Sequence, residues 1–69
     1  MKWYSSKELP PKDEDSVDDS VAVLVTFDGK KISTLAVYDY KIKRWFALAG
    51  GDYRIMDKPL KWAYPDVIE

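Results

Sequence analysis

The sequence contains neither cysteine nor histidine among its 69 residues. Without cysteine the chain can form no disulfide bond, no thiolate nucleophile and no cysteine-ligated zinc site. Without histidine it lacks the commonest general base and the commonest transition-metal ligand. No histidine is present to activate a serine, and the tandem glycine Gly50-Gly51 lacks the spacing of a phosphate-binding loop. We therefore predict a domain that is not an enzyme and has no catalytic residue, metal site or cofactor.

Net charge and long hydrophobic segments are also lacking. Eleven Lys and Arg residues face twelve Asp and Glu residues, so the net charge is only -1. This balance argues against a strongly DNA-binding domain, which is usually basic. The longest apolar run, Val21 to Val25, is far shorter than the roughly 20 residues that span a bilayer. Residues 1–8 contain no apolar signal-peptide core. We expect a cytoplasmic protein without membrane contact.

Short β-branched and aromatic segments alternate with turn residues along most of the chain. Asp28-Gly29 is a strong hairpin signal between two such segments. Gly50-Gly51 and the Asp57 to Pro59 segment predict two further turns. The pattern therefore predicts five strands, at residues 21–27, 31–39, 44–48, 53–56 and 60–64.

These strands predict an all-β fold. A five-stranded antiparallel meander leaves two open edges, and curling into a partly open SH3-like barrel protects them. We expect the Trp3 end of the chain to pack across one mouth of this barrel. After an extended segment at residues 2–4, Ser5 and Glu8 have the spacing of a capping box, which predicts one short helical turn near the N-terminus.

The chain is short enough to form a single domain over residues 1–69. Within it, residues 10–20 carry five acidic residues and no periodic apolar pattern, which predicts a mobile, solvated loop. The acidic residues of this loop do not have the spacing of an EF-hand, so we expect no calcium site there. The pattern assigns no structure to residues 66–69.

Several short motifs along the chain are similar to those of a known family. Trp3-Tyr4-Ser5 precedes Leu9-Pro10, and Val23-Leu24-Val25 forms the first long strand. Ala36-Val37-Tyr38-Asp39 follows, then an isolated Trp45, and finally Trp62 with Pro65. This order resembles a family of short uncharacterised domains from phages, prophages and gut bacteria. The chain departs from the family in its longer acidic loop and in lacking a repeated proline at the end. The resemblance implies the order of elements and a phage-related origin, and it implies no activity.

We expect aromatic side chains to form most of the hydrophobic core, because each large ring buries roughly 150–250 Å². The chain has three Trp, five Tyr and two Phe. We expect the Trp and Phe residues to be buried, including Phe27 and Phe46, rather than to form a stacking platform. Tyr40 and Tyr53 border turns and are expected to be exposed.

The one local cluster of basic and aromatic residues is the candidate binding surface. It consists of Tyr38, Tyr40, Lys41, Lys43 and Arg44. Without catalytic residues, the leading prediction is a non-enzymatic interaction domain that binds a protein or peptide partner. The alternative is weak binding of single-stranded nucleic acid, with tyrosines stacking on bases and cations contacting phosphates. A third possibility is homodimerisation through an exposed strand edge, so that the chain is a monomer or a weak homodimer.

Overall fold

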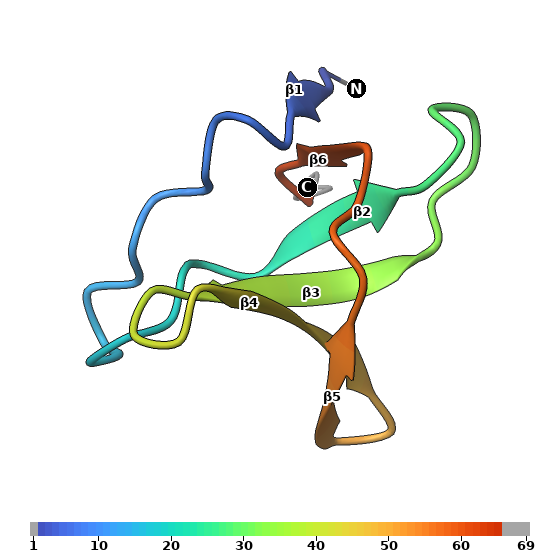
Figure 1. Ribbon diagram of the computed structural model, residues 1–69. Coiled ribbons are helices and arrows are strands. Elements are labelled where there is room, and N and C mark those ends of the chain that lie inside the picture. Colours follow the sequence, from blue (N-terminus) through green and yellow to red (C-terminus); the bar gives the residue numbers. More distant parts are fainter. Residues whose placement is uncertain (1, 66–69) are drawn as a thin grey trace, which may run out of the picture.

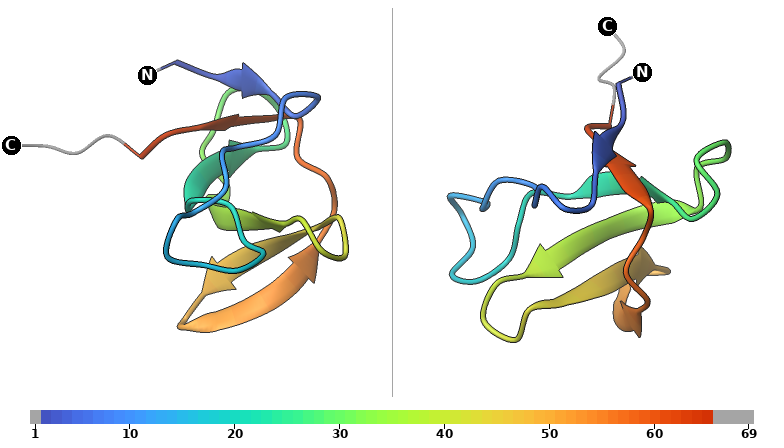
Figure 2. Two further views of the ribbon diagram at one scale, coloured as in Figure 1. Left: turned by 90° about the vertical axis from the view of Figure 1, so that its left-hand side faces the viewer. Right: turned by 45° about the horizontal axis from the view of Figure 1, so that its top comes forward.

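The computed structural model describes residues 2–65 and forms one antiparallel sheet of six strands in the order β1-β6-β2-β3-β4-β5 (Figure 1). Figure 2 shows the strands following one another in this order from one end of the molecule to the other. The all-β prediction is confirmed, and the described residues contain no helix. The strands are β1 (Tyr4–Ser5), β2 (Val23–Thr26), β3 (Thr34–Asp39), β4 (Arg44–Ala49), β5 (Asp52–Met56) and β6 (Lys61–Ala63).

The strand count and the simple meander were predicted wrongly. Tyr4–Ser5 is a sixth strand, and two residues are too few to give a periodic signal. Strands β2 to β5 follow one another as predicted, but β6 pairs with β2 instead of β5. No pairing joins the sheet ends β1 and β5 within the described part of the chain, so the sheet is not closed into a barrel.

The N-terminal segment also differs from its prediction. Residues after β1 form a turn in which the Lys7 amide donates to Ser5 Oγ at 3.2 Å, and the Glu8 amide donates to the Ser5 carbonyl at 3.0 Å. No helical turn follows, because the chain extends toward Pro10-Pro11. Tyr4, rather than Trp3, packs on the core, with its ring stacked on Trp62 at 4.7 Å between centroids.

The hairpin between β2 and β3 is confirmed, with a longer connection than the Asp28-Gly29 signal implies. The return strand begins at Thr34 instead of residue 31. Asp28 Oδ1 accepts hydrogen bonds from the Lys30 and Lys31 amides at 2.8 and 3.0 Å, which fixes the loop in a side-chain-capped turn. These bonds to the charged form lower the pKa of Asp28.

The core lies on one face of the curved sheet. Trp45 and Trp62 are 4% and 3% exposed, as expected for core tryptophans. The prediction was wrong for Phe27, which is 46% exposed because it lies at the start of the β2–β3 loop. Phe46 lies on β4 and is only partly buried. The remaining buried members of the core cluster are Val23, Val25, Ala36 and Tyr38.

The acidic loop is fastened to β3 at its base. The Ser20 amide donates to the Tyr38 carbonyl at 2.8 Å, and Ser20 Oγ accepts from the Tyr38 amide at 2.9 Å. The Tyr40 amide donates to the Asp18 carbonyl at 2.7 Å. Ser20 is 1% exposed, so its hydroxyl forms a buried hydrogen bond with the Tyr38 amide, in addition to the two main-chain hydrogen bonds. The mobility of the loop stays a prediction.

Candidate functional site

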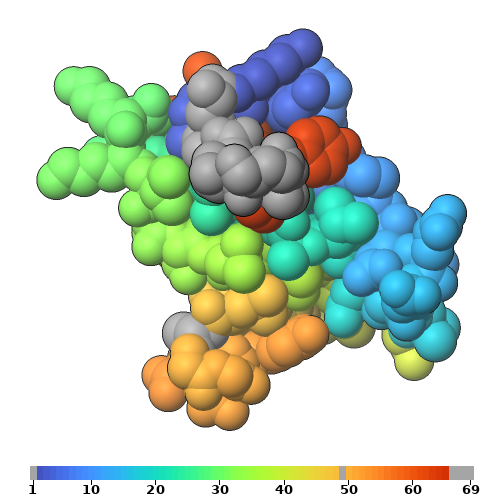
Figure 3. Space-filling view, turned by 180° about the vertical axis from the view of Figure 1, so that it is seen from behind, coloured from blue at the N-terminus to red at the C-terminus, as the bar shows by residue number. Residues whose placement is uncertain are grey.

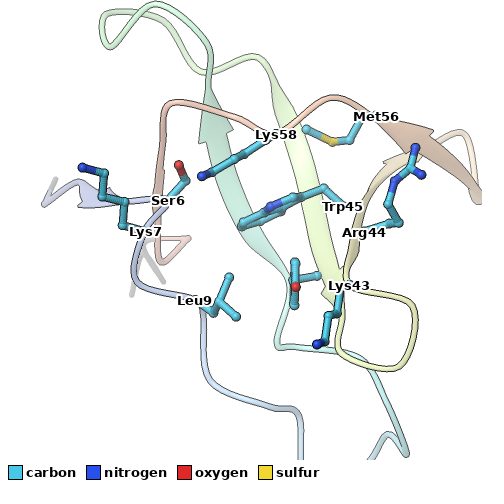
Figure 4. Close-up of a pocket in the computed structure, with 9 residues that line it drawn as sticks. Ser6, Lys7, Leu9, Lys43, Arg44, Trp45, Met56 and Lys58 are labelled. Atoms are coloured by element: carbon cyan, nitrogen blue, oxygen red, sulfur yellow. The ribbon is translucent and has the colours of Figure 1, made fainter.

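A groove of about 500 Å³ lies beside Trp45, where three separate parts of the chain meet (Figure 4). The turn after β1 forms one wall, the start of β4 forms another, and the chain leaving β5 forms the third. The lining residues are Ser6, Lys7, Leu9, Tyr38, Lys43, Arg44, Trp45, Met56 and Lys58.

The floor of the groove is apolar. Trp45 and Met56 are opposite each other in the β4–β5 register, and Trp45 is almost completely buried. Tyr38 packs against Trp45 edge to face, with 5.3 Å between the ring centroids. Leu9 adds an aliphatic side chain that is 42% exposed. The floor therefore offers Met56 and Leu9 as apolar contacts above a rigid aromatic base.

The rim of the groove is basic. Lys7, Lys43, Arg44 and Lys58 are all exposed, and none of the lining residues among positions 2–65 is acidic. Lys58 and Lys43 lie on opposite sides of the Trp45 indole in Figure 4. The net charge of the whole chain is only -1, so the four cations of the rim form a local excess of positive charge. Five of the twelve acidic residues lie in the loop of residues 10–20, while four of the eleven basic residues surround this groove.

The β3–β4 turn determines which of its cations reach the groove. Asp39 Oδ1 accepts hydrogen bonds from the Lys41 amide at 2.9 Å and from the Ile42 amide at 3.2 Å. Lys43 then adopts a left-handed backbone conformation, with φ of 58°. This conformation reverses the chain before β4 begins at Arg44. As a result Lys43 and Arg44 line the groove, whereas Lys41 does not.

The two tyrosines of the predicted binding surface are not freely exposed. Tyr38 is 8% exposed and forms part of the core, although it also lines the groove. Tyr40 is partly buried, and its hydroxyl donates a hydrogen bond to the Pro10 carbonyl. Burial, and to a smaller extent the neighbouring Tyr38, raise the pKa of the Tyr40 phenol. The expectation of an exposed Tyr40 was therefore wrong, whereas Tyr53 is 60% exposed as expected.

The groove contains three of the five predicted residues: Tyr38, Lys43 and Arg44. Sequence reasoning missed Lys7, Leu9, Met56 and Lys58, which come from distant parts of the chain. No local pattern connects these residues, because only the return of the chain after β5 brings Lys58 beside the turn that carries Lys7. Their common feature in the sequence is proximity to a proline or a turn, which is too frequent to be informative.

Within residues 2–65, no group of three or more acidic side chains is arranged to hold a metal ion. That part of the chain also has no helix with the length and hydrophobicity required to cross a membrane. No family model, curated protein or solved structure matches the chain.

Proposed function

We propose that this protein is a non-enzymatic binding domain whose groove accepts an acidic segment of a protein partner. The observation that carries the proposal is the composition of the groove. Four cations, Lys7, Lys43, Arg44 and Lys58, surround an apolar floor, and no acidic residue from the described part of the chain lies between them.

The expected binding energy comes from two sources. Exposed ion pairs contribute little, about 0–1 kcal/mol each, because water and salt screen them. Burial of one apolar side chain of the partner against Met56, Leu9 and the Trp45 edge adds about 1.5–3 kcal/mol. The best ligand is therefore an acidic peptide with one aliphatic or aromatic anchor, bound weakly and with a clear salt dependence.

Single-stranded nucleic acid is the second candidate, because the same cations could contact phosphates. Such binders also stack bases on exposed aromatic faces. Here Trp45 and Tyr38 are buried, and Tyr40 is held against Pro10. The groove therefore provides cations without a free ring face, which favours the acidic peptide over nucleic acid.

A titration of the ¹⁵N-labelled protein tests the proposal. The probe is a short peptide of alternating Asp and Glu around a central Leu, and the control peptide carries Lys in place of every acid. We expect amide shifts at Lys43, Arg44 and Met56, together with a shift of the Trp45 indole N–H. Equal shifts with both peptides, or shifts confined to another surface, would contradict the proposal.

A matched pair of variants separates groove binding from general attraction. R44E/K58E reverses two charges at the groove, while K30E/K31E makes the same change of net charge in the β2–β3 loop. We expect the first variant to lose binding and the second to retain most of it. A poly-dT oligonucleotide is titrated in parallel. If it binds more tightly than the peptide at the same salt concentration, the function is nucleic-acid binding instead.

The finer fold description also remains a proposal. We infer that the sheet is a partly open SH3-like barrel, and the pairing of β6 with β2 supports this inference. Through this pairing the last strand, β6, lies beside β2, which is the first strand of the meander formed by β2 to β5. A phage-related origin and a cytoplasmic location remain predictions.

A further inference from the structure

Strand β5 is an unprotected edge of the sheet. The two ends of the strand order are β1 and β5, and β1 contains only two residues. In contrast β5 has five residues and no proline, and residues 52–55 are all exposed. The β4–β5 hairpin projects from the lower end of the molecule in Figure 3. Proteins usually protect a long edge with proline, a bulge or a covering segment, and β5 has none of these among the described residues.

The turn before β5 indicates which main-chain groups face outward. Gly50 and Gly51 have φ of 60° and 83°, as in a two-residue hairpin turn closed by the Ala49–Asp52 pair. In this geometry the closing pair is hydrogen-bonded, and hydrogen-bonded and non-hydrogen-bonded pairs then alternate. Arg54, opposite Ala47, is therefore bonded to β4, whereas the main-chain groups of Tyr53 and Ile55 point away from the sheet.

We propose that two copies of this chain pair through β5 as antiparallel strands, with the twofold axis at Tyr53. This register places each Asp52 opposite Arg54 of the second copy. Asp52 and Arg54 lie on the same face of β5, so the register forms two reciprocal pairs of opposite charge. Centring the axis on Arg54 would instead place two arginines directly opposite each other, which is destabilising.

The apolar face of the hairpin supports the same arrangement. Tyr53 and Ile55 are each 60% exposed and lie on the face opposite to Asp52 and Arg54. Tyr53 continues a cross-strand row of Leu24, Leu35 and Leu48. With the axis at Tyr53, the two rings meet and join the rows of both copies. The occupant of this edge is therefore a second copy, because the edge is complementary to itself in charge and in apolar surface.

Because the chain has no cysteine, single-cysteine variants test both the contact and its register. In the proposed pair the Tyr53 Cα atoms are about 5.5 Å apart, within the range for a disulfide. The Ile55 positions are separated by about 13 Å along the strands, which is too far. Under mild oxidation we expect Y53C to form disulfide-linked dimers and I55C to remain monomeric. Equal cross-linking of the two variants, or none with Y53C, overturns the proposal.

Charge exchange provides a second test without oxidation. R54D places two acids opposite each other in both pairs and should raise the dimer dissociation constant roughly tenfold. The double variant D52R/R54D restores opposite charges across the axis and should recover the association of the natural chain. Sedimentation equilibrium measures all three proteins, with circular dichroism confirming that each is folded. A natural chain that remains monomeric up to millimolar concentration, or a double variant no better than R54D, overturns the proposal.

Discussion

Strands β5 and β6 follow each other in the chain and have opposite environments. β6 has three residues, and two of them, Trp62 and Ala63, are 3% and 0% exposed. β5 has five residues, and none of them is fully buried. Within residues 2–65, β6 pairs with both β1 and β2, whereas β5 pairs with β4 alone. The length of a strand therefore does not determine its contribution to stability, and its position in the sheet does. Substitutions on β6 should therefore lower the free energy of unfolding much more than substitutions on β5.

The largest effect is expected at Trp62 on β6. Its ring stacks on Tyr4, and its indole Nε1 donates to the Glu8 carbonyl at 2.6 Å. Replacement by alanine leaves a cavity and an unpaired carbonyl, and should cost about 3–5 kcal/mol. Urea denaturation followed by circular dichroism measures the loss. Trp62→Phe, which keeps a ring and removes only the indole N–H, should cost clearly less, and equal losses would show that the hydrogen bond dominates.

The next effect is expected at Ser20, which joins the acidic loop to β3. Ser20→Ala leaves the buried Tyr38 amide without its acceptor and should cost about 1–3 kcal/mol. Ser33→Ala is the matched control, because Ser33 is exposed and only its main-chain amide bonds to Val25. The control should change the free energy of unfolding by less than about 0.5 kcal/mol. A Ser20 variant as stable as this control would contradict the role of the hydroxyl.

Two aspartates with opposite pKa shifts give a smaller, pH-dependent effect. Desolvation first, and then repulsion from Asp39, Asp18 and Asp13, raise the pKa of Asp19 above its ordinary value of 3.8. Ionised Asp19 therefore lowers stability, and this cost appears as the pH rises from 3.8 through the raised pKa. Asp28 has a lowered pKa, so its favourable contribution is present above 3.8 and is lost as the pH falls through the lowered value.

Thermal unfolding of Asp19→Asn and Asp28→Asn between pH 2 and 7 tests these signs. At pH 7 we expect Asp19→Asn to melt slightly above the natural protein and Asp28→Asn slightly below it. Both differences should disappear at the acid end of the series, where every carboxyl is protonated. Differences of the same sign for the two variants would contradict the assigned causes.

The smallest effect is expected at Ile55 on β5. Its side chain is 60% exposed, so Ile55→Thr, which keeps the β-branched shape, should change the stability of the monomer by less than about 0.5 kcal/mol. Urea denaturation at low protein concentration measures this without any contribution from association. A loss comparable to that of Ser20→Ala would show that β5 belongs to the core and would remove the contrast with β6.

Local patterns predicted most of the fold. The apolar and aromatic segments predicted β4 and β5 within one residue at each end and located β2 and β3, which are both shorter than predicted. The tandem glycine predicted the β4–β5 turn. The pairing of β6 with β2 and β1 could not be predicted, because it depends on contacts such as Tyr4 with Trp62 between the two ends of the described chain. The sequence also failed to predict the exposure of Phe27, because the residue type alone does not show whether a ring at the start of a loop faces the core or the solvent.

The sequence predicted only those residues of the candidate site that are neighbours in the chain. Lys43 and Arg44 belong to the basic cluster visible in the sequence, and both line the groove. Lys7 and Lys58 reach it only through the tertiary fold, so no spacing rule connects them. The tyrosines of the cluster were assigned to the surface because of their polar tips, but Tyr38 packs in the core and Tyr40 bonds to Pro10.

The hydrogen bond from Trp62 to Glu8 joins residues separated by 54 positions. Closing so long a loop costs more entropy than forming the neighbouring hairpins, so this junction should form late, after the folding transition state. Substitutions there would then accelerate unfolding while leaving the refolding rate nearly unchanged. The resistance of this domain to proteolysis under conditions of rapid cleavage would thus depend on how slowly β1 and β6 separate.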